Sequence, residues 1–192
     1  MADLARLLMT EDALVLANGG AGAIAALAAC GPAVLIQRGH VVDIGGSPLQ
    51  LIAMASARAV EVGLADKCDA AEVENADATG GLFIGEGARP GLLDLPRFLW
   101  ACHTRDRPAV VYLGGHGWIA ALDAGADLIV IDLQRHRQAP GAVVAGRAGA
   151  MRRVREAVAA LPVLLAATDE IAAAASAQVE ESLRRSSPIS DS

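Results

Sequence analysis

Apolar positions fall in short continuous runs along the chain, and longer alanine-rich segments with helix signals separate these runs. Residues 13–17 (ALVLA) and 109–113 (AVVYL) show no alternation of apolar and polar positions. Continuous apolar runs of roughly four to eight residues are typical of strands covered on both faces of a sheet. Because helices separate the strands, right-handed crossovers and a mostly parallel sheet are expected. The pattern therefore predicts a three-layer α/β fold.

The same pattern gives the order of the expected elements. Strands are expected at residues 13–17, 33–37, 59–62, 81–84, 109–113, 127–133 and 142–145. Helices are expected from the glycine turn at 18–22 to residue 30, at 47–57, within 65–79, at 94–104, at 118–124 and at 148–160. The connection 134–140 is too short for a helical crossover, so the last strand is expected to run antiparallel to its neighbour.

The C-terminal segment has a different pattern. Four apolar residues recur there at a spacing of four, namely Ile171, Ala175, Val179 and Leu183. On a helix they form one narrow apolar stripe, which is more typical of a docking or self-association helix than of a catalytic element. We expect a sheet domain at 1–165, this helix at 166–185 and a flexible polar tail at 186–192.

Charge and cysteine content narrow the classes of function. The net charge of −6 argues against a surface that binds nucleic acid or an anionic membrane. The three cysteines, Cys30, Cys68 and Cys102, are widely spaced and form no C-x-x-C pair, so neither a disulfide framework nor a zinc site is expected. The N-terminal residues lack the pattern of a signal peptide, and no apolar stretch has the length of a membrane span. We expect a soluble, cytoplasmic protein.

Four stretches, taken in order, resemble one family of enzymes. They are residues 13–23 (ALVLANGGAGA), 34–47 (VLIQRGHVVDIGGS), 59–68 (AVEVGLADKC) and 125–146 (GADLIVIDLQRHRQAPGAVVAG). These stretches resemble bacterial selenocysteine synthase and D-glucosaminate-6-phosphate ammonia lyase, which are fold type I enzymes that depend on pyridoxal phosphate (PLP). The resemblance covers roughly residues 7–160. It implies the large domain of that fold, a seven-stranded, mostly parallel sheet whose seventh strand is antiparallel, which agrees with the short connection before residue 142.

The resemblance implies a set of cofactor-binding positions. In the family, the glycine and asparagine turn after the first strand holds the PLP phosphate, and small residues at a helix N-terminus let backbone N–H groups approach an anion. His40 matches a histidine of the lyase branch. The turn, the segment around His40 and the following glycine-rich loop together place Asn18, Gly19, Gly20, Ala21, Arg38, Gly45, Gly46 and Ser47 near the cofactor. A structural role for the glycine turn and for His40 stays open as the alternative.

Two chemical groups of the family are replaced. The Schiff-base lysine, counted from the GADL motif at 125–128, falls on Arg135, and the only lysine of the chain is Lys67. Arginine stays protonated and cannot act as the amine that forms an aldimine. The aspartate that pairs with the pyridinium nitrogen falls on Tyr112 or Leu113, and neither supplies a negative charge. The chain also shows no counterpart of the family's N-terminal segment or of its small C-terminal domain.

Three functions are consistent with these residues. The first is a degenerate, lysine-less subunit that works in a homo- or hetero-oligomer with a lysine-bearing PLP-family chain. PLP would then be bound non-covalently, carried by the partner chain, or absent. The motivating observation is that the stretches forming the core match the family, while the catalytic lysine and the ring-pairing aspartate are replaced.

The second function is an independent lyase or transferase that uses His40, His116, Arg135 and His136, or non-covalent PLP. Arginine and histidine side chains suit a phosphorylated or carboxylated small molecule. Against this stands the simpler interpretation of 135–137 as a solvated basic loop. The third is a dinucleotide-binding domain, because residues 20–25 satisfy G-x-G-x-x-[GA] after a strand. The acidic residue expected after the next strand is replaced by Gln37 and Arg38.

Overall fold

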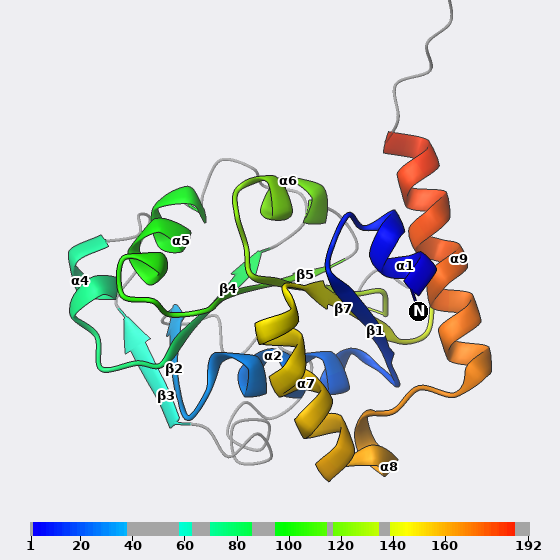
Figure 1. Cartoon of the computed structure of the whole chain (residues 1–192), viewed down its shortest axis with the longest axis horizontal. Helices are drawn as coiled ribbons and strands as arrows, with labels where there is room; N and C mark the ends of the chain where they lie inside the picture. Colours follow the sequence, from blue (N-terminus) through cyan, green and yellow to red (C-terminus); the bar gives the residue numbers. More distant parts are fainter. Residues whose placement is uncertain are drawn as a thin grey trace, which may run out of the picture.

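The sheet that the sequence predicts is present and has seven strands in the described part of the chain. The structure, a computed structural model, describes residues 2–37, 58–62, 70–85, 95–114, 117–134 and 139–186. The strands lie in the order β1-β7-β6-β5-β4-β2-β3 across the sheet (Figure 1). Their bounds are β1 (Asp12–Leu16), β2 (Ala33–Gln37), β3 (Arg58–Val62), β4 (Gly80–Gly85), β5 (Ala109–Gly114), β6 (Leu128–Asp132) and β7 (Ala142–Gly146).

Strand direction confirms the expectation drawn from the short connection before residue 142. Strands β2 to β6 pair in parallel, and β7 is antiparallel to both of its neighbours, β1 and β6. Leu16 and Asp132 both pair with Ala142 of β7. The carboxyl ends of β1 and β6 therefore lie level with each other at one edge of the sheet, and β5 ends beside β6 at the same edge because Gly114 pairs with Asp132.

Helices cover both faces of the sheet, so the domain has three layers. One face carries α2 (Gly19–Cys30), α7 (Ala148–Ala160) and α8 (Pro162–Leu165), whose buried residues share a core cluster with Val34, Leu82 and Val130. The other face carries α1 (Ala2–Leu7), α4 (Ala70–Asn75), α5 (Leu95–His103), α6 (Trp118–Asp123) and α9 (Asp169–Ser186) (Figure 1). Among the helices in the described segments, none combines the length and apolar character that crossing a membrane requires.

Helix α2 is buried along most of its length because its side chains are small. A Cβ atom at Gly22 would come within 2.9 Å of Val130 and Ala142, so glycine lets the helix lie close against β6 and β7. This packing explains the second glycine of the G-x-G pattern, Gly22, without a dinucleotide. In addition, β1 is an edge strand here, whereas the dinucleotide-binding fold places its first strand in the middle of the sheet.

The apolar stripe near the C-terminus packs within the chain. Ala175 and Val179 of α9 are buried in the same core cluster as α1 and β1, and Ile171 and Leu183 are partly buried there. Figure 1 shows α9 beside α1 and β1. Helices α1 and α8 were not anticipated from the sequence, because α1 is only six residues long and α8 only four. The helix expected at 47–57 lies outside the described residues.

Candidate functional site

The turn between β1 and α2 is held by its own asparagine. Asn18 has extended backbone angles, and its side-chain oxygen accepts a hydrogen bond from the Ala21 N–H at 2.8 Å. The Gly22 N–H donates to the Asn18 carbonyl oxygen at 3.1 Å. These contacts make Asn18 the N-cap of α2, a role in which asparagine satisfies donors that the first helical turn leaves without partners. Of the predicted cofactor-binding residues, Asn18, Gly19, Gly20 and Ala21 lie together at this turn.

An aspartate that the sequence analysis did not single out lies against this turn. Asp132 is the last residue of β6 and is only 7% exposed. A Cβ atom placed on Gly19 would overlap its carboxylate, coming within 2.6 Å of Cγ. Glycine is therefore required at position 19 so that the Asp132 side chain can lie across the start of α2. The sequence did hold a signal, because Asp132 is the one charged residue in the buried strand LIVID.

Tyr112 on the neighbouring strand β5 donates a hydrogen bond to this aspartate. Its hydroxyl lies 2.6 Å from Asp132 Oδ2 and 3.3 Å from the Gly19 carbonyl oxygen. The Gln134 N–H donates to Asp132 Oδ1 at 3.0 Å, and the Gln134 side-chain oxygen accepts from the Gly19 N–H at 3.1 Å. Asp132, Tyr112 and Gln134 thus connect β5 and β6 with the N-terminus of α2.

The surroundings of the Asp132 side chain supply hydrogen-bond donors and a helix end. An O–H···O separation of 2.6 Å lies in the range of hydrogen bonds to an ionised oxygen, which are shorter and stronger than neutral ones. The N-terminus of a helix carries a partial positive charge that stabilises a nearby anion. A buried carboxylate without such partners would be costly, so the donors and the helix end together account for its place in the core.

The described residues of this turn do not fit the PLP groups that the resemblance implies. A phosphate monoester carries close to two negative charges at neutral pH. Two like unit charges about 4 Å apart repel by about 4 kcal/mol at the effective dielectric of a protein site, so the Asp132 carboxylate opposes a phosphate at this turn. Near the end of β5, the position expected to pair with a pyridinium nitrogen falls on Tyr112 or Leu113, which are 1% and 6% exposed, and Tyr112 is already hydrogen-bonded to Asp132.

The remaining predicted site residues cannot be placed in the site. The structure does not describe the positions of Arg38, His40, Gly45, Gly46, Ser47, His116, Arg135 and His136. The strand geometry still locates one of them along the chain, because Arg135 follows the last residue of β6 by three positions.

A second polar cluster lies at the opposite edge of the sheet, where β6 begins. Asp127 accepts hydrogen bonds from the Ala109 N–H at 2.9 Å and from the His103 ring at 2.8 Å, and it forms an ion pair with Arg147 at 3.1 Å. It lines a cavity of about 600 Å³ together with His103, Arg107, Arg147 and Arg152. In open α/β sheets, ligands bind at the carboxyl ends of strands. We therefore assign Asp127 of the GADL motif to structure, joining α5, β5 and the start of α7.

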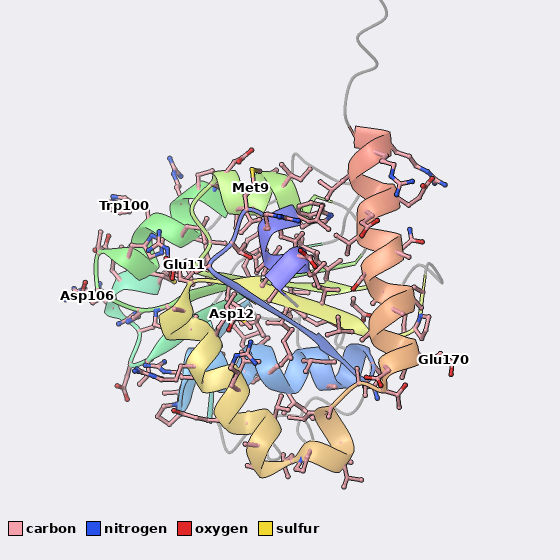
Figure 2. The ribbon with its side chains drawn as sticks, turned by 45° about the vertical axis from the view of Figure 1, so that its right-hand side comes forward. Met9, Glu11, Asp12, Trp100, Asp106 and Glu170 are labelled. Carbon is pink, nitrogen blue, oxygen red and sulfur yellow. The ribbon has the colours of Figure 1, made fainter. Side chains whose placement is uncertain are left out.

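Helix α5 directs neighbouring side chains to different surroundings. Cys102 lies in the core, whereas His103 contacts Asp127. Trp118 is buried as a core aromatic, whereas Trp100 is 57% exposed and projects from α5 (Figure 2). Within the described segments, no group of three His, Cys, Asp or Glu side chains could hold a metal ion.

Comparison with solved structures identifies the fold. The chain is similar to a structure of D-glucosaminate-6-phosphate ammonia-lyase with a TM-score of 0.80 and 18% sequence identity, covering 95% of this chain and 57% of that one. Cystathionine gamma synthase from Xanthomonas oryzae pv. oryzae gives a TM-score of 0.72 at 15% identity, with 95% and 50% covered. Serine palmitoyltransferase from Sphingomonas wittichii gives 0.66 at 15% identity, with 96% and 50% covered.

These likenesses establish the fold and leave the activity open. The chain has the fold of the large domain of fold type I PLP-dependent enzymes, which confirms the expected fold class. It spans about half the length of the solved structures that it matches. At the level of sequence, neither a protein-family model nor a curated protein matches the chain.

Proposed function

We propose that this chain is a non-catalytic, lysine-less subunit related to PLP-dependent lyases and transferases, and that it works in an oligomer with a catalytic relative. The observation that carries the proposal is the Asp132–Tyr112 hydrogen bond at the turn that the resemblance assigns to the PLP phosphate. The fold has kept its core, while this edge holds residues that hydrogen-bond to one another.

The missing nucleophile supports the proposal. The lysine of the resembled family follows the strand that corresponds to β6, and Arg135 stands there in this chain. A guanidinium keeps its proton at physiological pH and offers no free amine for an aldimine. The only lysine of the chain, Lys67, does not stand at that position: it comes well before β6 in the sequence, and β4 and β5 lie between the two. The chain by itself therefore lacks the covalent step of this chemistry.

The missing ring partner supports it independently. A carboxylate beside the pyridinium nitrogen is the group that lets PLP act as an electron sink. The resemblance puts Tyr112 or Leu113 at that position near the end of β5; neither carries a carboxylate, and the Tyr112 hydroxyl donates to Asp132. A neutral phenol does not balance the positive charge of a protonated ring. In the proposed assembly, PLP is therefore carried by the partner chain, and this subunit contributes contacts or regulation.

A groove bordered by one exposed apolar side chain offers a place for such a partner. Met9 is 80% exposed and has a backbone φ of 53°, an uncommon conformation for a residue with a side chain. It borders a groove of about 400 Å³ that Leu8, Trp118, Ile119 and Leu122 also line. Figure 2 shows Met9 at the surface of the layer that contains α1 and α6. Apolar side chains gathered at a groove are typical of a protein contact.

Native mass spectrometry of the complex purified from its own host tests the proposal. We expect a mass that contains this chain together with a larger, PLP-carrying relative. The variant Met9→Glu should weaken that complex, and Val163→Glu, which changes another exposed apolar residue on α8, serves as the matched control. A homo-oligomer or monomer that carries its own small molecule would contradict the proposal and favour an independent enzyme that uses His40, His116, Arg135 or His136.

A further inference from the structure

We propose that Asp132 is an internal replacement for a cofactor phosphate: its carboxylate occupies the N-terminus of α2 and closes the turn at Asn18, Gly19, Gly20 and Ala21 to PLP and to other phosphate esters. The inference deepens the proposed function, because it states how this subunit dispenses with the cofactor. It rests on contacts within the chain and needs no partner.

The position of the carboxylate is the first argument. Asp132 extends from β6 across the Cα of Gly19, the first residue of α2, so closely that no side chain could be placed on Gly19. A helix N-terminus attracts anions through its partial charge and its exposed N–H groups. Here a carboxylate from the same chain already takes that place. Gly19 is thus explained by the aspartate alone and does not imply a bound ligand.

The hydrogen-bond donors of the turn are the second argument. Within the described residues, the Gly19 N–H donates to Gln134, the Ala21 N–H to the Asn18 side chain and the Gly22 N–H to the Asn18 carbonyl. A phosphate bound at a helix N-terminus would use donors of this kind. It would have to displace these acceptors and also approach the Asp132 charge.

The hydroxyl of Tyr112 is the third argument. It donates to Asp132 Oδ2 at 2.6 Å, and both side chains are more than nine-tenths buried. The short hydrogen bond stabilises the carboxylate in the position that a phosphate would need. Tyr112 and Asp132 therefore act as a pair, and replacing the carboxylate by a small neutral side chain should reopen the turn.

Calorimetric titration of the full chain with inorganic phosphate and with pyridoxamine phosphate tests the inference. Neither probe has an aldehyde, so Lys67 and the chain's amino terminus cannot react with it. The wild-type chain should show no binding at millimolar concentrations. Asp132→Ser removes the charge and the bulk, and we expect it to bind both probes at least about a hundredfold more tightly than the wild type.

The chain offers a control of the same charge away from the turn. Asp123 is the last residue of α6 and is exposed. Asp123→Ser changes the net charge equally but leaves the turn closed, so it should gain no affinity. If Asp132→Ser does not fold, Asp132→Asn preserves the size of the side chain and should still gain affinity for both probes.

Thermal unfolding gives a second readout. Phosphate should raise the Tm of Asp132→Ser and leave the Tm of the wild type unchanged, because only the variant has an open anion site. The inference is overturned if the wild type binds either probe as tightly as the variant does, if neither Asp132 variant binds, or if Asp123→Ser gains the same affinity. None of these results depends on finding a partner chain, so this test and that of the proposed function can fail separately.

Discussion

Removing the hydroxyl of Tyr112 should reveal how strongly the buried carboxylate depends on it. The substitution Tyr112→Phe deletes one oxygen atom and preserves the ring, which packs between the sheet and α2. The deleted group is the donor that lies 2.6 Å from Asp132 Oδ2. Asp132 keeps the Gln134 N–H as a partner at Oδ1, so the carboxylate loses part of its hydrogen bonding.

The magnitude follows from burial and charge. Hydrogen bonds to a charged group contribute about 1.5–3 kcal/mol, roughly twice a neutral one, and here both partners are more than nine-tenths buried. We expect Tyr112→Phe to lower the free energy of unfolding by about 2 kcal/mol. In a chain of this size that corresponds to a fall in Tm of roughly 4–8 °C. In the background of Asp132→Asn, where the acceptor is neutral, the same substitution should cost about 1 kcal/mol.

Urea unfolding of the wild type, the two single variants and the double variant measures the coupling between the two side chains. We expect a coupling energy of about 1 kcal/mol. Thr104→Val is the control, because the exposed Thr104 hydroxyl donates only to the Ala101 carbonyl and its loss should cost no more than about 0.5 kcal/mol. A cost for Tyr112→Phe as small as that of the control would refute the interpretation that the Tyr112 hydroxyl makes a strong buried hydrogen bond to Asp132.

Three further predictions concern other parts of the chain. The hydrogen bond from Arg155 holds the pKa of Asp12 in the folded chain below its ordinary value. The pair therefore stabilises the fold fully above the unfolded pKa of about 3.9. This stabilisation is lost as the pH falls through the lower pKa that Asp12 has in the folded chain. Arg155→Gln should therefore lower the free energy of unfolding by about 0.5–1 kcal/mol at neutral pH, because the pair is partly exposed. In urea unfolding, the difference between the variant and the wild type should shrink below about pH 4. A difference that does not change with pH would contradict this prediction. Asp127→Ala should lower the free energy of unfolding by about 3 kcal/mol, because it leaves the Ala109 N–H and the side chains of His103 and Arg147 without their acceptor. A loss below about 1 kcal/mol would show that water takes the place of the carboxylate. Burial raises the pKa of the Cys30 thiol, so Cys30 should react with a thiol reagent only after urea is added, and rapid labelling in the native state, located by peptide mapping, would show that the core opens.

The order of strands and helices could be predicted from the sequence because it is a local property. The runs at 13–17 and 109–113 are apolar on both sides of the strand, and the buried β1 and β5 lie there within a residue at each end. Asparagine is a frequent N-cap residue, and α2 begins directly after Asn18. The antiparallel direction of β7 also followed locally, because the connection is too short to cross the sheet.

The chemistry at the carboxyl edge could not be predicted in this way. The resemblance assigned Asn18, Gly19, Gly20 and Ala21 to a phosphate, and the structure instead brings Asp132 to Gly19 across more than a hundred positions of the chain. It also joins Tyr112 to that aspartate across a parallel pair of strands. In the sequence, Asp132 is only a charged residue at the end of an apolar run.

The sequence by itself therefore determined the fold class, the order of its elements and the antiparallel direction of β7. Each of these depends on residue types and on spacings of a few positions. Only the tertiary structure brought the Asp132 carboxylate against Gly19 at the start of α2 and the Tyr112 hydroxyl within hydrogen-bond distance of that carboxylate. Those contacts exist because the order of the strands aligns the ends of β1, β5 and β6 at one edge of the sheet. A buried carboxylate is stable only where hydrogen-bond donors surround it, and this alignment supplies the Tyr112 hydroxyl as one of them.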